Sequence, residues 1–132
     1  LIFQSNENMP LCKIDSMLFE QIISNLLSNA INYTPIFTEI HINITIVNDN
    51  LMLEIIDFGN GIDEAYLVHI FEKFYRLPHS KAGGTGLGLS IVKGFIEAQN
   101  GSIKAIKNEP HGLKFVILIP VETSYIKNLK NE

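Results

Sequence analysis

Residues 83–90 read GGTGLGLS and lead directly into the apolar run of a predicted helix. Glycines at this density allow the backbone to come very close to a ligand or to another turn of chain. The free amides and the dipole at a helix N-terminus favour an anion, and the glycines would let the backbone pack against it. A glycine run alone is a weak signal, and without further motifs a simple turn before a helix would explain it better.

Two familiar phosphate loops do not fit this stretch. A dinucleotide-binding G-x-G-x-x-G loop follows a buried strand directly. The glycines here follow the polar loop Lys81-Ala82-Gly83, and their spacing is one residue short. A P-loop ends in Gly-Lys-Ser/Thr, and the sequence contains no such triplet.

The elements around the glycine stretch alternate in a way that predicts an α+β two-layer sandwich. The first helix begins at Asp15 or Ser16, ends before Pro35, and has an apolar face of Leu18, Ile22, Ile23, Leu26, Leu27 and Ile31. The later elements are strands at 39–47 and 51–57, a short helix at about 63–71, an irregular stretch at 72–85, a helix at about 87–99, and strands at 103–107 and 113–119. Residues 1–13 could add an edge strand, and the tail at 121–132 gives no clear signal.

Length and composition predict one domain and exclude several classes of protein. The 132 residues, 46% of them hydrophobic, can bury a real core. The net charge is −4 and the basic residues are scattered, which argues against nucleic-acid binding. The single cysteine, Cys12, excludes a disulfide framework. The apolar runs are too short for a membrane span, there is no basic-plus-apolar leader, and a start at Leu1 suggests a piece of a longer protein.

Two further motifs lie upstream of the glycine stretch. Asp57-x-Gly59-x-Gly61 ends the second predicted strand and combines a fixed acceptor with a loop that allows close approach. Asn25 and Asn29 share one face of the first helix because they are four residues apart. They could be two polar surface positions, or one amide oxygen could ligate a divalent cation such as Mg²⁺, which prefers oxygen ligands and shares its shell with phosphates.

Taken in order, these motifs resemble the four boxes of sensor histidine kinase catalytic domains. The resemblance covers about residues 11–120, nearly the whole chain, and four boxes in order are far more specific than any one. The N box corresponds to Asn25-Leu-Leu-Ser-Asn29-Ala-Ile-Asn32-Tyr33-Thr34-Pro35, the G1 box to Asp57-Phe-Gly59-Asn-Gly61-Ile62, the F box to Phe71-Glu-Lys73-Phe74-Tyr-Arg76, and the G2 box to Gly84-Thr85-Gly86-Leu87-Gly88-Leu-Ser-Ile-Val.

The resemblance implies the Bergerat ATP-binding fold, in which about three helices cover one face of a mixed sheet. It implies that Asp57 accepts a hydrogen bond from the adenine amino group, with Gly59 and Gly61 beside it. It also implies that Asn29 binds magnesium and that Asn25 is a second catalytic-site residue facing the nucleotide. Tyr33 corresponds to an aromatic residue near the nucleotide, although a core tyrosine fits its position almost as well. The phosphate-side loop would consist of Gly84, Thr85, Gly86, Leu87 and Gly88.

One departure from the family pattern concerns the phosphates. Many members carry Lys or Arg where this chain has Asn32. Lys73 or Arg76, within the stretch at 72–85 that corresponds to the ATP lid, could supply the missing charge. Ordinary surface positions explain both residues equally well.

The function implied is that of the ATP-binding catalytic domain of a two-component sensor histidine kinase. It would donate the γ-phosphate of Mg-ATP to a histidine on a separate dimerisation domain of the same kinase and so act indirectly on a response regulator. The resemblance further implies a cytoplasmic domain of a membrane-associated sensor, with residues 1–132 forming one domain.

Two alternatives remain open at this stage: a hydrolysing ATPase or anti-sigma-type serine kinase of the wider superfamily, and a nucleotide-binding module without catalysis. Members of the first class place a glutamate where this chain has Asn25, and an amide cannot act as general base toward water. For the nucleotide-binding module without catalysis, the only indication is Asn32, which stands where many members carry a basic residue. None of the four histidines is followed by an acidic residue, as the family's acceptor is, so all four are interpreted as surface or structural residues.

Overall fold

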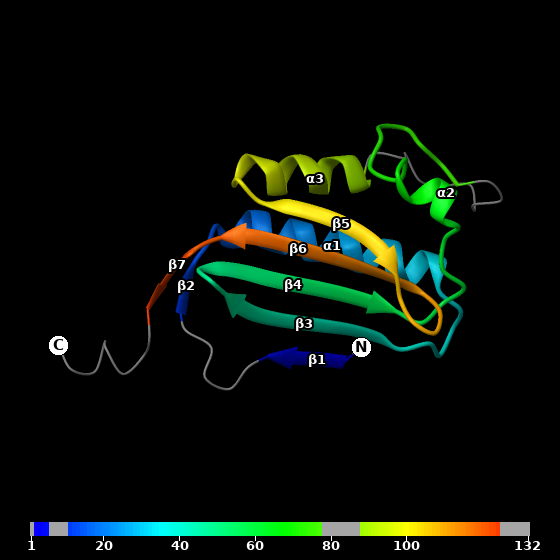
Figure 1. Cartoon of the computed structure of the whole chain (residues 1–132), viewed down its shortest axis with the longest axis horizontal. Helices are drawn as coiled ribbons and strands as arrows, with labels where there is room; N and C mark the ends of the chain where they lie inside the picture. The colour runs from blue at the N-terminus through cyan, green and yellow to red at the C-terminus, as the bar shows by residue number, and fades with distance from the viewer. Residues whose placement is uncertain (1, 6–10, 78–87, 125–132) are drawn as a thin grey trace.

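The computed structural model describes residues 2–5, 11–77 and 88–124, with the backbone alone for Ile2–Ser5, Tyr33 and Ser124 (Figure 1). The elements in chain order are β1 (Ile2–Ser5), β2 (Leu11–Lys13), α1 (Ser16–Tyr33), β3 (Ile40–Val47), β4 (Asn50–Asp57), α2 (Glu64–Leu67), α3 (Gly88–Ala98), β5 (Ser102–Lys107), β6 (Leu113–Pro120) and β7 (Glu122–Ser124).

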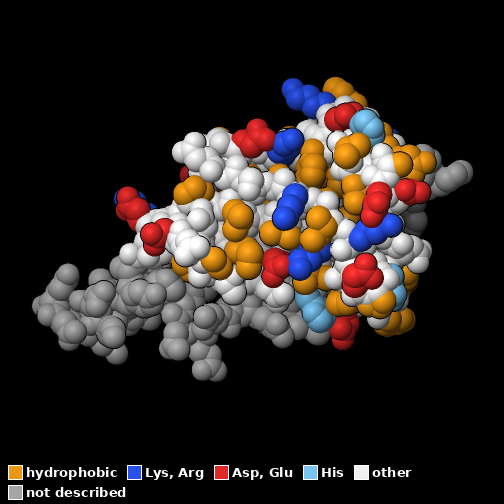
Figure 2. All heavy atoms as spheres, viewed as in Figure 1, with side chains coloured by type: hydrophobic (Ala, Val, Ile, Leu, Met, Phe, Trp, Pro, Cys, Tyr) orange, Lys and Arg blue, Asp and Glu red, His pale blue; other side chains and the backbone are white. Residues whose placement is uncertain are grey.

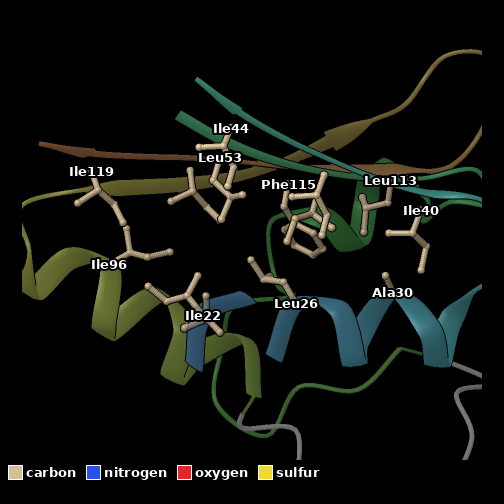
Figure 3. Packing of buried hydrophobic residues seen from close by; sticks show 14 of the residues in the cluster. Ile22, Leu26, Ala30, Ile40, Ile44, Leu53, Ile96, Leu113, Phe115 and Ile119 are labelled. Carbon is tan, nitrogen blue, oxygen red and sulfur yellow. The ribbon is translucent and has the colours of Figure 1, made fainter. Parts of the chain in front are cut away.

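A five-stranded sheet and the helices packed on one of its faces form the two predicted layers. The strand order is β1-β3-β4-β6-β5, with β1 parallel to β3 and every other pair antiparallel, so the sheet is mixed. Figure 1 shows α1 behind the strands, and Figure 3 shows α1 and α3 side by side beneath the sheet. The structure therefore confirms the α+β sandwich.

The core forms because every second residue of the central strands points toward the helices (Figure 3). The side chains of Leu53 and Ile117 are fully buried there, opposite Ile22 and Leu26 of α1 and Ile96 of α3. Complete burial of each such side chain contributes about 1.5–3 kcal/mol to folding. This packing fixes the end of β4, at Asp57, relative to the beginning of β6, at Leu113.

Helix α1 begins as predicted. The Asp15 carboxylate caps it by accepting hydrogen bonds from the backbone N–H groups of Met17 and Leu18. The helix ends at Tyr33, before Pro35. The predicted apolar face was wrong at one position: Ile31 is 64% exposed, and Ala30 is buried instead. Successive residues are rotated by about 100° on a helix, and residues 22, 26 and 30 set the buried direction.

Two short elements depart from the predictions. Helix α2 covers only Glu64–Leu67, because the chain then continues through three-residue turns in which His69 N–H donates to Tyr66 O and Glu72 N–H to His69 O. The tail contains β7, which pairs antiparallel with β2 in a separate two-stranded sheet. The expected edge strand at the N-terminus is present as β1, but the pairing of β2 with β7 was not predicted.

In the part of the chain that the structure describes, no helix covers the opposite face of the main sheet, which is the face seen in Figure 2. Basic, acidic and apolar side chains are interspersed across this view. One ion pair joins adjacent strands there, with Lys114 Nζ 2.9 Å from Glu54 Oε2. Within the described ranges, no helix combines the length and the hydropathy needed to cross a bilayer.

Candidate nucleotide-binding site

The site centres on Asp57, which ends β4 at the boundary between the sheet and the G1 loop. Its side chain is buried, with 6% of its surface exposed. Oδ1 accepts two backbone hydrogen bonds, from Gly59 N–H at 3.0 Å and from Leu113 N–H at 3.2 Å. These bonds fix the carboxylate between its own loop and the start of β6.

The electrostatic state of Asp57 follows from this burial. Desolvation raises the pKa of the carboxyl above its ordinary value of 3.8, and the hydrogen bonds from Gly59 and Leu113 oppose the rise without cancelling it. Among the described residues, no hydrogen bond is found to Oδ2. A carboxylate held through one oxygen can accept a hydrogen bond at the other from an amino group of a ligand.

The end of α1 packs against the G1 loop. Thr34, the residue after the helix, donates its hydroxyl hydrogen bond to Ala30 O at 2.8 Å. Its methyl carbon lies 3.1 Å from the position that a Cβ on Gly59 would occupy. Gly59 is buried, so a side chain there would displace Thr34. The fold thus brings together the N box and the G1 box, which lie on separate elements.

Asn25 lies against the start of α3, which belongs to the G2 box. Its Nδ2 donates to Gln21 O at 2.9 Å, and its Oδ1 lies 4.0 Å from the position of a Cβ on Gly88. Asn29 is on the same face of α1 one turn later and is partly buried. Asn25 of the N box therefore lies beside the first residue of α3. Asn32 is exposed.

The F box is anchored at its beginning. Phe71 packs edge-on against Phe115 of β6 at 6.1 Å between ring centroids, and Lys93 Nζ of α3 lies 5.8 Å from the Phe71 centroid. Lys73 and Arg76 are both exposed, and residues 72–77 contain no helix or strand, in agreement with the predicted irregular stretch. The rest of that stretch, including Gly84 and Thr85, lies outside the described residues. So do Gly86 and Leu87 of the G2 box and the side chain of Tyr33.

Sequence reasoning missed the loop that joins β5 to β6. Asn108, His111, Gly112 and Leu113 all contact the Asp57–Gly59 segment. The sequence showed this region only as the turn Asn-Glu-Pro-His-Gly, and His111 was interpreted as a surface or structural histidine. These contacts span more than fifty positions along the chain and leave no local pattern.

Comparisons with known proteins find similar sequences and a similar fold. KdpD, a sensor protein of Clostridium acetobutylicum, is 37% identical over 120 residues, which is 88% of this chain and 13% of KdpD. The catalytic domain of histidine kinase ThkA has a TM-score of 0.79 at 29% identity, covering 90% of this chain and 76% of that one. Full-length ShkA has a TM-score of 0.81 at 22% identity, covering 94% of this chain and 26% of ShkA.

The family model described as histidine kinase-, DNA gyrase B- and HSP90-like ATPase matches residues 14–123. That range runs from just before α1 to the last described strand and includes all four boxes. The chain therefore belongs to the family of histidine kinase-, DNA gyrase B- and HSP90-like ATPases.

Proposed function

We propose that this chain is the ATP-binding catalytic domain of a two-component sensor histidine kinase, which donates the γ-phosphate of ATP to a histidine on a separate dimerisation domain. The observation that carries the proposal is the buried Asp57 carboxylate, held through Oδ1 by two backbone N–H groups. Its other oxygen would accept a hydrogen bond from the adenine amino group. Guanine has a carbonyl at the matching position, so this acceptor favours ATP over GTP.

The relatives support the kinase assignment. KdpD is called a sensor protein and ThkA a histidine kinase, and ShkA was solved in complex with AMPPNP. The chain spans only 13% of KdpD, so the partners of a whole sensor kinase are part of the proposal. They are the dimerisation domain of the same kinase and, indirectly, a response regulator, with this domain on the cytoplasmic side of the membrane.

The phosphate end of the nucleotide would lie between α1 and the first turn of α3. The N-terminal amides and the dipole of α3 favour an anion there. Asn29 would hold a magnesium ion through its amide oxygen, and the residues fit such a role because oxygen is the donor that Mg²⁺ prefers. Bound there, the ion would neutralise charge on the phosphate oxygens. Lys73 and Arg76, both exposed and both in the F box, could add positive charge.

Phosphoryl transfer of this kind depends on positioning and charge neutralisation more than on acid–base chemistry. The chain's own contribution would be to hold the adenine through Asp57 and the phosphates through the α1–α3 junction. Asn25, whose amide binds Gln21 O and faces Gly88, has no basic group to activate water. This favours transfer to an imidazole, which is already nucleophilic, over hydrolysis.

Incubation with γ-labelled ATP tests the proposal. Alone, the chain should neither label itself nor release phosphate at a useful rate. With the histidine-containing helical domain of its own kinase, label should appear on that domain in an acid-labile, base-stable form, as expected of a phosphoramidate. Rapid phosphate release by the lone chain, or an acid-stable label, would favour a hydrolysing ATPase or a serine kinase instead.

A further inference from the structure

We propose that the loop between β5 and β6, residues 108–112, positions the base-reading carboxylate of Asp57, with His111 and Asn108 as its positioning residues. The inference rests on the proposed function, because it assigns to these residues a share in adenine selectivity. Neither residue belongs to any of the four boxes, and neither is expected to touch the nucleotide.

The first contact is made by His111. Its Nδ1 lies 3.1 Å from the carbonyl oxygen of Gly59. A carbonyl oxygen can only accept, so the ring must carry its proton on Nδ1 to make this bond. His111 therefore holds the peptide plane that follows Gly59.

The plane on the other side of Gly59 is held by Asp57 itself, because Gly59 N–H donates to Oδ1 at 3.0 Å. Gly59 has no side chain to restrict the rotation between these two planes. With both planes fixed, the N–H vector that reaches Asp57 is also fixed. If the bond from His111 is lost, the peptide plane that follows Gly59 can rotate. The hydrogen bond from Gly59 N–H to Asp57 Oδ1 then loses its alignment.

Asn108 adds a second connection on the backbone of Asp57. Its Nδ2 donates to Asp57 O at 3.3 Å and to His111 O at 3.2 Å, so one amide group bridges the carboxylate's own residue and the histidine. The backbone N–H of Asn108 also closes the loop by donating to Gly112 O at 3.1 Å. The loop is thus bonded internally as well as to the G1 segment.

Close packing makes this arrangement stiff. A Cβ on Gly112 would lie 2.0 Å from Asp57 O, and a Cβ on Gly61 would lie 3.1 Å from Gly112 O. Leu113 N–H, the next donor along, reaches Asp57 Oδ1 at 3.2 Å. The loop therefore touches Asp57 at its carbonyl oxygen and, through Leu113 and Gly59, at its carboxylate.

Loss of the loop contacts should affect recognition of the adenine base and not of the phosphates. An Asp57 carboxylate out of alignment would lose its hydrogen bond to the adenine amino group, whereas the phosphate contacts at the α1–α3 junction would be unaffected. Inosine triphosphate carries a carbonyl in place of that amino group and gains little from Asp57 in any case. Loss of the loop contacts should therefore reduce affinity for ATP while leaving that for inosine triphosphate nearly unchanged.

The test compares dissociation constants for Mg-ATP and Mg-inosine triphosphate, by competition with a fluorescent ATP analogue. His111→Leu removes the donor, and His111→Asn keeps an N–H close to the Nδ1 position. The Leu variant should bind ATP about three- to tenfold more weakly, the range expected for one hydrogen bond, with inosine triphosphate changed by less than about twofold. The Asn variant should restore most of the selectivity.

Two further variants keep the test independent of folding. Asn108→Ser removes the bridging amide at a second position and should cause the same selective loss. Gln99→Met is the control: it removes a similar side-chain bond, from Gln99 Nε2 to Phe95 O at 3.0 Å, at the C-terminal end of α3. It should leave both affinities as in the wild type. Thermal unfolding is followed for the wild type and the four variants.

Each outcome bears on a different claim. If the wild type does not bind ATP, the proposed function fails. If the wild type prefers ATP and Asp57→Asn abolishes the preference, while His111→Leu and Asn108→Ser retain it, the positioning role is wrong and the proposed function stands. An equal loss of affinity for both nucleotides, together with a lower unfolding temperature, would assign the loop a purely structural role and overturn the inference.

Discussion

The carboxylate oxygen Oδ1 of Asp57 accepts a hydrogen bond from the backbone N–H of Leu113, 3.2 Å away and 56 positions later in the chain. The bond joins the end of β4 to the beginning of β6, two strands that pair antiparallel along most of their length. It satisfies one oxygen of a buried acid with a donor that cannot move independently of the sheet. The direction of the other oxygen is set by the same bond.

The raised pKa of Asp57 predicts a pH dependence of stability. Between the ordinary value of 3.8 and the raised value in the fold, the native state holds more protons than the unfolded chain. The free energy of unfolding should therefore fall as pH rises through this window and level off above it. The total fall is about 1.4 kcal/mol for each pH unit by which the pKa of Asp57 is raised. Urea unfolding of the nucleotide-free protein between pH 4 and pH 7 measures it.

Asp57→Asn is the control for this effect, because an amide keeps the size of the group and does not titrate. The difference in unfolding free energy, wild type minus variant, should decrease with rising pH. A difference that is constant, or that increases with pH, would mean that the native carboxyl is not destabilised by burial.

Gly112 should be intolerant of any side chain. It has a φ of +111°, and a Cβ would lie 2.0 Å from Asp57 O, a backbone atom that cannot turn aside. We expect Gly112→Ala to destabilise the protein by about 2–4 kcal/mol, from backbone strain together with displacement of the loop.

Gly94→Ala provides the matched comparison for Gly112→Ala. Gly94 is exposed in α3, and nothing lies within 4 Å of the position of its Cβ. Alanine there should stabilise the helix by up to about 1 kcal/mol. Chemical denaturation of both variants measures the contrast, and similar effects of the two substitutions would contradict the close approach of Gly112 to Asp57.

Asn29 should couple nucleotide affinity to magnesium. In the wild type, ATP should bind more tightly with Mg²⁺ than in the presence of a chelator. Asn29→Ala should reduce that ratio by roughly tenfold or more, because loss of even an outer-shell partner of a metal ligand weakens a site on that scale. Calorimetric titrations under both conditions give the ratio.

Ser28→Ala, one position earlier and on an exposed face of α1, is the control for Asn29→Ala. It should leave the magnesium ratio unchanged. If Asn29→Ala behaves like Ser28→Ala, Asn29 has no part in holding the ion.

The main elements could be predicted from the sequence because their periodicities are long. Residues Ile40, Ile42 and Ile44 alternate in β3 as expected, and Asp15 caps α1. The β2–β7 pair was missed because three residues are too few for an alternating pattern to be recognised. The length of α2 was overestimated because apolar spacing does not distinguish a continuous helix from successive short turns that bury Ile70.

The candidate site also contains residues that the sequence motifs indicate and residues that only the fold reveals. Asp57, Asn25 and Asn29 lie in contiguous motifs, so the sequence alone showed a fixed acceptor and two amides on one helix face. The resemblance of these motifs to the kinase boxes then implied a nucleotide site. The residues that contact Asp57 and Gly59 from the β5–β6 loop could not be found from sequence motifs. Asn108 and His111 reach the G1 segment from 51 and 52 positions away along the chain. Only the antiparallel pairing of β4 with β6 brings them there.

The most direct test of the central claim, that Asp57 reads the adenine of ATP, is calorimetric titration of Mg-ATP into the wild type and Asp57→Asn. The amide oxygen can still accept from Gly59 and Leu113, which leaves an NH₂ group facing the adenine amino group, donor against donor. We predict tight, Mg²⁺-dependent binding by the wild type and a loss of about 1–3 kcal/mol in the variant, with the fold intact by circular dichroism. Equal affinity of the two proteins for ATP would contradict the account.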